Sequence, residues 1–240
     1  VHGACTAGEG IQRWSERERQ QREEHAADRL DSGRIVAAFI PASGAATRMF
    51  KDLHPPLSEG TAAALLRSWR AFPFADRLVE PVGPDPAVDL AGQILDRLQL
   101  ARLPKGEVPF FALQGGQAMT AFEAHHAEWR SVGAHPLVFT VPVEFAAQLP
   151  AKYREWEEVQ WDVQDPSTDT LAWNPTAGAV ARSADGALHF RPGGHGALLA
   201  NLRAVPADAA VLRNIDNAVP PDRHAVRNAW RTALLGALWH

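Results

Sequence analysis

The sequence has very little cysteine and no long apolar run. Cys5 is its one cysteine in 240 residues, so no disulfide can form within the chain. A single unpaired thiol is typical of a reducing compartment. The N-terminus lacks the basic region and apolar stretch of a signal peptide, and no segment approaches the ~18 apolar residues of a transmembrane helix. We therefore expect a cytoplasmic protein that does not enter a membrane.

Neither sign of charge is in large excess. The chain has 24 lysines and arginines against 28 aspartates and glutamates, which gives a net charge of −4. Nucleic-acid binders carry a basic face, and proteins that bind membrane surfaces carry a polybasic stretch. The sequence has neither feature, so we expect no nucleic-acid partner and no membrane partner.

Several catalytic signatures are also missing. The chain has no H-E-x-x-H pair, no cysteine cluster for zinc and no G-x-S-x-G elbow around a nucleophilic serine. It has no Walker A loop and no dinucleotide-binding fingerprint. These absences argue against the zinc proteases, the serine hydrolases of the elbow type and the common phosphate-loop enzymes.

The chain does contain strands and helices in alternation. Short apolar runs predict strands at 35–40, 137–141 and 209–215, and alternating apolar and polar residues predict a strand at 159–163. Helical spacing predicts helices near 65–72, 88–98, 120–130, 145–158 and 195–202, and from residue 222 onward. Strands that alternate with helices favour a mostly parallel sheet covered on both faces, so the expected fold class is a three-layer α/β/α sandwich.

The two ends of the chain differ from its centre. Residues 12–34 are rich in Glu, Arg and Gln and predict a solvated helix, so we expect residues 1–34 to be a helical extension packed on the body. Residues 35–240 are expected to form one α/β domain. Because the chain starts at Val1 and ends at His240 inside a predicted helix, we expect this domain to be truncated at its C-terminus.

The last predicted helix carries two distinct sets of side chains. Its apolar stripe consists of Val226, Trp230, Ala233, Leu234 and Ala237. Arg223, Arg227 and Arg231 lie four residues apart and share one face. This face is either solvated or supplies one arginine in place of a lysine at a ligand site.

The most informative segment is the loop at residues 41–49. It follows a predicted strand, and we expect a helix to start near Ala45 or Ala46. Small residues let a backbone approach a ligand closely, the N–H groups of a helix start favour an anion, and the forked donors of Arg48 suit phosphate. The loop predicts a cradle for a nucleoside triphosphate; an ordinary tight turn is the alternative. The candidate binding residues are Ala42, Ser43, Gly44, Ala45, Ala46 and Thr47.

Two further loops carry a cation or a cluster of glycines. In residues 103–106, a turn made by proline and glycine can hold the Lys105 ammonium toward a phosphate. In residues 190–198, three glycines surround one histidine, so Gly194 and His195 are candidates for contact with a flat ligand. The alternatives are a surface turn with a solvated lysine and a loop whose glycines only serve turn geometry.

Polar residues end two of the predicted strands. Asp216 and Asn217 follow the strand at 209–215, and Gln164 follows the strand at 159–163. Ligands of open α/β sheets bind at the carboxyl ends of strands, so Asp216 is a candidate Mg²⁺ ligand together with substrate phosphates. Gln164 and Asn217 are candidate nucleotide contacts, and Asp216 is expected to open on the same cleft as the loop at 41–49. Capped turns are the alternative for both segments.

Together these motifs resemble an uncharacterised bacterial family, the domain of unknown function 4301. The resemblance is carried by residues 40–51, 103–106, 166–170, 190–198 and 214–217, and extends from about Cys5 to the C-terminus. Members of that family are longer at both ends, and the family implies no established activity.

The same order of motifs resembles, more distantly, the uridylyltransferases that make UDP-sugars within the GT-A-like nucleotidyltransferases. Their Gly-Gly-x-Gly-Thr-Arg-Leu loop is similar to residues 43–49, and their Pro-Lys-Gly is similar to residues 104–106. Their base-reading Gln, their Gly-His-Gly and their Asp-Asn have counterparts in Gln164, in residues 194–196 and in residues 216–217. The resemblance implies a GT-A-like fold and a Mg²⁺-dependent transfer.

This sequence departs from that pattern at several positions. Ser43 and Ala46 stand where the loop has glycines. Met119 and Asp165 stand where those enzymes have an arginine and a lysine, and Arg213 replaces a lysine. Two lost cations weaken the case for catalysis more than the case for binding.

The resemblance therefore implies two functions to be compared. The first is an enzyme that joins a nucleoside triphosphate to a sugar phosphate and releases pyrophosphate, with Arg48, Lys105 and Asp216 as catalytic residues and Mg²⁺ on Asp216. The second is a non-catalytic protein that binds a nucleotide or a nucleotide-sugar. Charge neutralisation and positioning dominate such a transfer, so the lack of a nucleophile motif is no objection.

Overall fold

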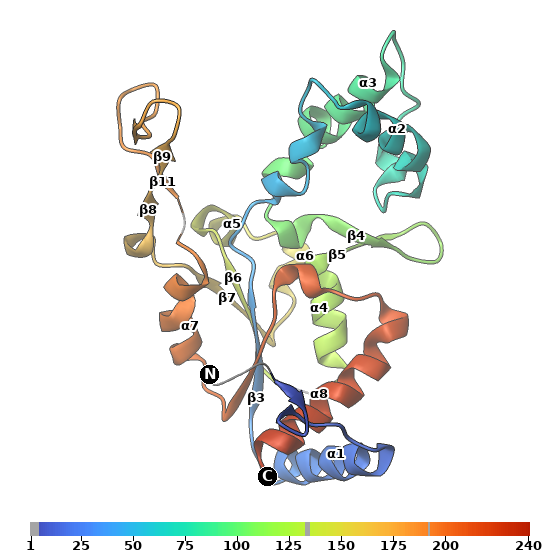
Figure 1. Cartoon of the computed structure of the whole chain (residues 1–240), viewed down its shortest axis with the longest axis vertical. Helices are drawn as coiled ribbons and strands as arrows, with labels where there is room; N and C mark the ends of the chain where they lie inside the picture. Colours follow the sequence, from blue (N-terminus) through green and yellow to red (C-terminus); the bar gives the residue numbers. More distant parts are fainter. Residues whose placement is uncertain (1–4, 133–134, 192) are drawn as a thin grey trace.

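A four-stranded parallel sheet forms the centre of the protein (Figure 1). The computed structural model describes residues 5–132, 135–191 and 193–240. The spatial order of the strands is β12 (Ala209–Leu212), β3 (Val36–Pro41), β6 (Leu137–Val141) and β7 (Val159–Val163), and all neighbours run parallel. The sequence therefore predicted the central strands and their parallel direction.

The two middle strands are buried on both faces. Residues 36–40 of β3 and every residue of β6 are buried, as expected for continuous apolar runs in a parallel sheet. The expected bounds of β6 and β7 are confirmed. The strand expected at 209–215 ends at Leu212, because Ile215–Asn217 fold into a single 3-10 turn that begins at Asn214.

A thick layer of helices covers one face of the sheet. It consists of α1 (Glu16–Asp31), α4 (Ala121–Arg130), α6 (Ala151–Arg154) and α8 (His224–Leu238). Val36, Ala38 and Ile40 point into this layer and join Phe122 in the largest core cluster. Helix α1 lies against α8 (Figure 1), and a Cβ at Gly236 would stand 1.8 Å from the Arg22 carbonyl oxygen.

The opposite face of the sheet has a much thinner cover. Its buried cluster contains only Phe39, Val138 and Leu198, with Leu202 and Val205 packed against it. The cover comes from α7 (Leu199–Ala204) and the 3-10 turn His195–Leu198 that leads into it. The fold is thus a mixed α/β fold whose parallel sheet has helices on both faces, as the sequence predicted, with layers of very unequal thickness.

A helical lobe is inserted after β3. It holds α2 (Glu59–Ser68) and α3 (Pro86–Gly92), has a core of its own and lies at the top of Figure 1. The helix expected to start near Ala45 or Ala46 is absent from the described structure. Only the 3-10 turn Ala46–Arg48 forms there, and Ala46 is buried in the core of the lobe.

The remaining elements are short. Hairpin strands β4 (Pro109–Ala112) and β5 (Ala118–Thr120) precede α4, whose capping box at Thr120 and Glu123 confirms the predicted helix start. The single helix expected at 145–158 is wrong. Two short helices stand there, α5 (Val143–Ala147) and α6, because Pro150 between them cannot donate an N–H.

Small two-stranded sheets complete the described structure. β8 (Thr170–Leu171) pairs with β11 (Phe190–Arg191). β9 (Trp173–Asn174) pairs with β10 (Ala179–Val180), and β1 (Thr6–Ala7) pairs with β2 (Gly10–Ile11). Pro192, within the expected glycine-rich loop, lies outside the described residues, as do residues 1–4 of the expected N-terminal extension.

The expected apolar stripe of helix α8 is wrong for three of its residues. Val226, Trp230 and Leu234 are exposed, whereas Ala233 of that stripe is buried as expected, together with Arg231. The helix turns its arginines inward because they pair with a buried carboxylate of α4.

No helix among the described residues is long and apolar enough to cross a membrane.

Candidate functional site

The order of the strands in the sheet reverses between β3 and β12. From β3 the chain continues to β6 and β7 on one side, while β12 returns to the other side of β3. Neighbouring strands whose connections leave in opposite directions create a crevice at their carboxyl ends, where open α/β sheets bind ligands. The predicted loop after β3 and the predicted turn after β12 therefore meet at the position where such sheets bind ligands.

A cavity of about 470 Å³ lies at this crevice. It brings together residues from four separate segments, including most of the candidate residues named from the sequence. Its lining residues are Pro41, Ala42, Ser43, Gly44, Ala45, Arg48, Met49, Lys105, His195, Asn214, Ile215 and Asp216. The predicted loop and Asp216 thus open on one cavity.

The loop after β3 is held by bonds at both of its ends. The Ala42 N–H donates to the Thr140 carbonyl at 2.8 Å, and the Ala46 N–H donates to the Leu103 carbonyl at 3.0 Å. Ala46 is also fully buried, so its N–H is not available to a ligand. Thr47 is exposed but does not line the cavity. The cradle is therefore shorter than predicted.

Lys105 and Asp216 contact each other in the lining of the cavity. The Lys105 ammonium donates to both carboxylate oxygens of Asp216, at 2.8 and 3.1 Å. Half of the Asp216 side chain is exposed, and 17% of the Lys105 side chain. Gly106 fixes the position of this lysine, because a Cβ there would stand 2.2 Å from the Phe122 ring. A predicted cation and a predicted metal ligand thus neutralise each other.

Three glycines in or next to the site face empty space: Gly44 lines this cavity, Gly196 lines a neighbouring one, and Gly194 lines neither. A Cβ on Gly44, Gly194 or Gly196 would meet no atom within 4 Å, and none of the three has a positive φ. Neither packing nor backbone geometry requires glycine at these positions. By contrast, a Cβ on Gly193 would stand 2.7 Å from the Thr168 carbonyl oxygen, so packing alone explains that glycine.

Gln164 joins two loops of the site. Its amide oxygen accepts from the Ser43 hydroxyl at 3.1 Å, and its amide nitrogen donates to the Gly193 carbonyl at 3.2 Å. The side chain is buried. Its polar atoms already have protein partners, so Gln164 can read a base edge only by releasing one of them.

His195 lines the cavity, and Asn217 lies in the lining of a neighbouring cavity. His195 is exposed at the start of its 3-10 turn and lines the cavity. The Asn217 side chain accepts from the Asn214 N–H at 3.1 Å and lines a neighbouring cavity rather than this one. His195 is therefore placed for contact with a ligand, whereas Asn217 mainly shapes the turn.

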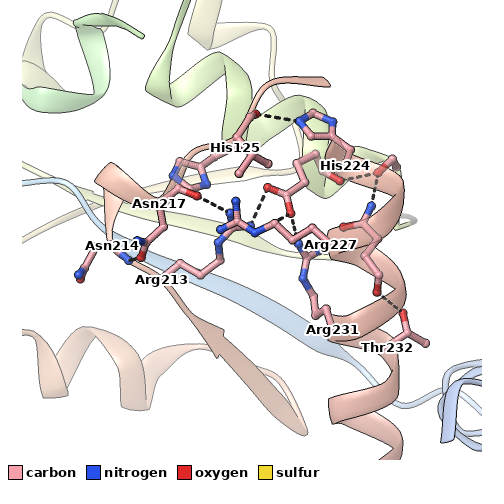
Figure 2. Close-up of polar contacts among 12 residues, drawn as sticks. His125, Arg213, Asn214, Asn217, His224, Arg227, Arg231 and Thr232 are labelled. Atoms are coloured by element: carbon pink, nitrogen blue, oxygen red, sulfur yellow. Dashed lines mark hydrogen bonds and ion pairs between the residues drawn. The ribbon is translucent and has the colours of Figure 1, made fainter. Parts of the chain in front are cut away.

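Hydrogen bonds from His125 and Arg213 hold the turn that carries Asp216 (Figure 2). His125 on α4 bonds the Ile215 carbonyl at 3.0 Å, and Arg213 donates to the Asn217 carbonyl at 2.9 Å. Burial, followed by the nearby Arg213 charge, lowers the pKa of His125 to about 3. His125 is thus neutral, and its Nε2 carries the proton that the carbonyl accepts.

Next to this turn, one buried carboxylate forms ion pairs with three arginines. Glu128 on α4 is fully buried and pairs with Arg213 at 2.8 Å, with Arg227 at 3.6 Å and with Arg231 (Figure 2). The expectation that the α8 arginines are solvated or replace a lysine of the site is wrong for Arg227 and Arg231. Sequence reasoning missed this cluster, because the four-residue spacing of the arginines does not reveal a partner some 100 positions away.

The site offers few groups to a metal ion on its own. Among the residues that the structure describes, no group of three or more histidine, cysteine or acidic side chains is placed to hold one. Asp216 is the carboxylate of the cavity lining. A single carboxylate fits Mg²⁺ only when substrate phosphates supply further ligands, which is the usual arrangement for this ion.

Comparison with known proteins gives a family but no activity. The chain belongs to the family described as Domain of unknown function (DUF4301), whose model matches residues 1–67 and 89–240. No curated protein and no solved structure matches the chain.

Proposed function

We propose that this family member binds a nucleoside triphosphate in the cavity at the end of β3 and transfers its nucleotidyl group to a phosphate monoester, with release of pyrophosphate. One observation carries the proposal. A single cavity at the carboxyl ends of β3 and β12 is lined by Gly44, Arg48, Lys105 and Asp216. The order of motifs adds support for a GT-A-like nucleotidyltransferase.

The two cations would divide the phosphate groups between them. Arg48 is exposed at the cavity wall and offers planar, forked donors that match phosphate oxygens. Lys105 is a compact charge in the same lining, and its position next to Asp216 lets it move from the carboxylate to a phosphate. The open space at Gly44 would allow the backbone to approach a phosphate closely.

Asp216 would hold a Mg²⁺ ion that arrives with the nucleotide. When bound, the ion would neutralise charge on the phosphates. Lys105 must leave Asp216 for this to happen, so nucleotide binding would exchange one ion pair for two new contacts.

The proposed transfer needs no protein nucleophile. A phosphate oxygen of the acceptor attacks the α-phosphorus of the triphosphate, a new P–O bond forms, and the bond to the β-phosphate breaks to release pyrophosphate. The protein contributes position and charge, as is general in transfers of phosphorus groups.

A specific observation favours a second candidate, a non-catalytic nucleotide-binding protein. Met119 and Asp165 stand where the similar enzymes have cations, so Arg48 and Lys105 are the two Arg and Lys residues of the cavity lining. The Gln164 amide is also occupied by protein partners. A cradle without a full set of cations would bind a nucleotide and leave it intact.

Two measurements on the chain separate these functions. A thermal-shift panel of nucleoside triphosphates with Mg²⁺ tests binding, since a ligand at 100 times its dissociation constant adds about 2.7 kcal/mol of stability. Release of pyrophosphate from the stabilising triphosphate and a sugar phosphate or alkyl phosphate tests transfer. Binding with release supports the enzyme, binding without release supports the binding protein, and no stabilisation by any triphosphate overturns both.

A further inference from the structure

A second cavity of about 450 Å³ adjoins the proposed phosphate cavity. The two share Pro41, His195 and Asn214, so a ligand can extend from one into the other. The second cavity lies on the thinly covered face of the sheet, where the 3-10 turn at 195–198 and α7 meet β3 and β12. Its volume is within the ~300–1,000 Å³ of small-molecule sites.

The walls of this cavity are mainly apolar. Phe39, Leu198 and Leu202 belong to the small core cluster of that face. Leu212 is paired in register with Phe39, so both side chains point to the same face of the sheet. Helix α7 covers Phe39 but leaves Leu212 60% exposed, and Leu199 is 55% exposed beside it. Leu199 and Leu212 therefore line a gap in the helix layer, and this apolar surface extends to the phosphate cavity.

Two of the four polar side chains that line the second cavity already have partners in the protein. Arg213 gives its guanidinium to Glu128 and to the Asn217 carbonyl, and the Asn217 side chain accepts from the Asn214 N–H. A hexose, whose hydroxyls all need partners, would leave several of them unpaired against leucine and phenylalanine. Burying an unpaired hydroxyl is unfavourable, whereas burying a hydrocarbon is favourable.

We propose that this cavity binds the apolar organic part of a phosphate monoester such as an alkyl phosphate, whose phosphate lies in the neighbouring cavity near Lys105 and His195. The inference rests on the phosphate-binding half of the proposed function and names the class of acceptor. In the transfer, an oxygen of the alkyl phosphate attacks the α-phosphorus of the triphosphate, which forms a diphosphate linkage and expels pyrophosphate.

An NMR titration with methyl, butyl, hexyl and octyl phosphate, below their micelle-forming concentrations, tests the proposal without requiring activity. The Gly44 amide reports on the phosphate cavity and the Leu199 amide on the apolar cavity. We expect all four ligands to shift Gly44 and only the longer chains to shift Leu199. Affinity should rise about threefold to fourfold for each buried methylene group until the cavity is full.

Leu199→Asp and Leu234→Asp form a matched pair of variants. Leu199 and Leu234 are 55% and 61% exposed and both lie on helices, but only Leu199 lines the cavity. Leu199→Asp should remove most of the gain in affinity that comes with chain length, whereas Leu234→Asp should preserve that gain.

The outcomes distinguish this inference from the proposed function. Methyl phosphate that binds at Gly44 with no gain from chain length would overturn the apolar site and leave the phosphate site standing. No shift of Gly44 by any of the four ligands would overturn both. Tighter binding of glucose 1-phosphate than of hexyl phosphate would overturn the apolar preference. Sedimentation could instead show a dimer that Leu199→Asp converts to a monomer, with no effect of chain length on ligand affinity. That result would show that a second copy of the chain covers the leucines.

Discussion

Two ionic clusters flank the same short turn after β12, and they differ in almost every physical respect. On the inner side, Glu128 is fully buried among Arg213, Arg227 and Arg231. On the outer side, Lys105 pairs with Asp216, whose side chain is half exposed. The inner cluster joins β12, α4 and α8, whereas the outer pair joins two loops of a cavity.

Burial decides what each cluster can do. Charges removed from water must keep their partners, because an unpaired buried charge costs several kcal/mol. An exposed pair contributes only about 0–1 kcal/mol and exchanges easily for water, ions or a ligand. The inner cluster therefore holds the turn in place, and the outer pair is free to rearrange around a ligand. The following variants act on one cluster and should spare the other.

The largest effect is expected from Glu128→Gln. The substitution removes the one carboxylate that pairs with the three arginines, so we expect the free energy of unfolding to fall by about 3–5 kcal/mol. Urea denaturation measures the change. Glu157→Gln, which alters an exposed carboxylate, is the control and should stay within about 0.5 kcal/mol of the parent. A loss below about 1 kcal/mol for Glu128→Gln would mean that the cluster does not hold the turn.

Lower pH should reduce the free energy of unfolding, because His125 next to the inner cluster takes up a proton more readily in the unfolded chain than in the folded one. Its pKa in the folded chain is about 3, against 6.5 ordinarily, so the unfolded chain binds a proton that the folded chain does not. The contribution is fully present above pH 6.5 and is lost as the pH falls from there toward 3. Between pH 8 and pH 5 the loss should be about 2 kcal/mol.

His125→Gln isolates this contribution from that of His126, whose pKa is also lowered by burial. Urea denaturation at several pH values should show a smaller loss of stability toward pH 5 in the variant than in the parent. Equal pH dependence in both proteins would contradict a neutral, buried His125.

On the outer side, Arg48→Ala should affect binding rather than folding. Arg48 is exposed at the cavity wall, and a hydrogen bond to a charged group contributes about 1.5–3 kcal/mol, so triphosphate affinity should fall about 10- to 150-fold. Calorimetric titration measures it. Arg67→Ala, an exposed arginine of α2, is the matched control and should bind as the parent does. Unchanged affinity in Arg48→Ala would remove that residue from the site.

The smallest change in stability is expected from Lys105→Met. The pair with Asp216 is exposed enough that its loss should cost less than about 1 kcal/mol. The variant should nevertheless separate the two roles of the cavity, because Mn²⁺ alone should bind the freed carboxylate more tightly while the triphosphate binds less tightly. Manganese relaxation measurements and calorimetry report the two affinities. If both moved in the same direction, exchange of Lys105 between carboxylate and phosphate would be excluded.

Much of the fold was predictable because it depends on local apolar runs. The bounds of the strand at 137–141 were predicted correctly, since a short run of apolar residues with only Thr140 between them favours a buried strand. In place of the helix expected after Ala45, only the 3-10 turn Ala46–Arg48 forms, and its Ala46 N–H donates to the Leu103 carbonyl on the far side of an inserted lobe, a contact that the local sequence does not reveal.

The candidate site was predictable in its members but not in its contacts. Small residues, a cation and a strand end identified Gly44, Arg48 and Asp216, which do line one cavity. The pairing of Lys105 with Asp216 and the burial of Arg231 depend on residues far apart in the chain. The faces of α8 were misassigned because arginine looks solvated in a sequence, and only the partner carboxylate makes its burial favourable.

Gly44→Ala tests most directly whether the loop after β3 is shaped for a ligand rather than for the fold. A Cβ there would meet no protein atom within 4 Å, so the free energy of unfolding should stay within about 0.5 kcal/mol of the parent. A bound phosphate would meet that Cβ, and the loss of one charge-assisted hydrogen bond should weaken triphosphate binding about tenfold or more. Gly60→Ala, in α2, is the control for the added methyl group. Unchanged stability with weakened binding is the expected result of the paired measurement, and unchanged triphosphate affinity in Gly44→Ala would show that no phosphate approaches this loop.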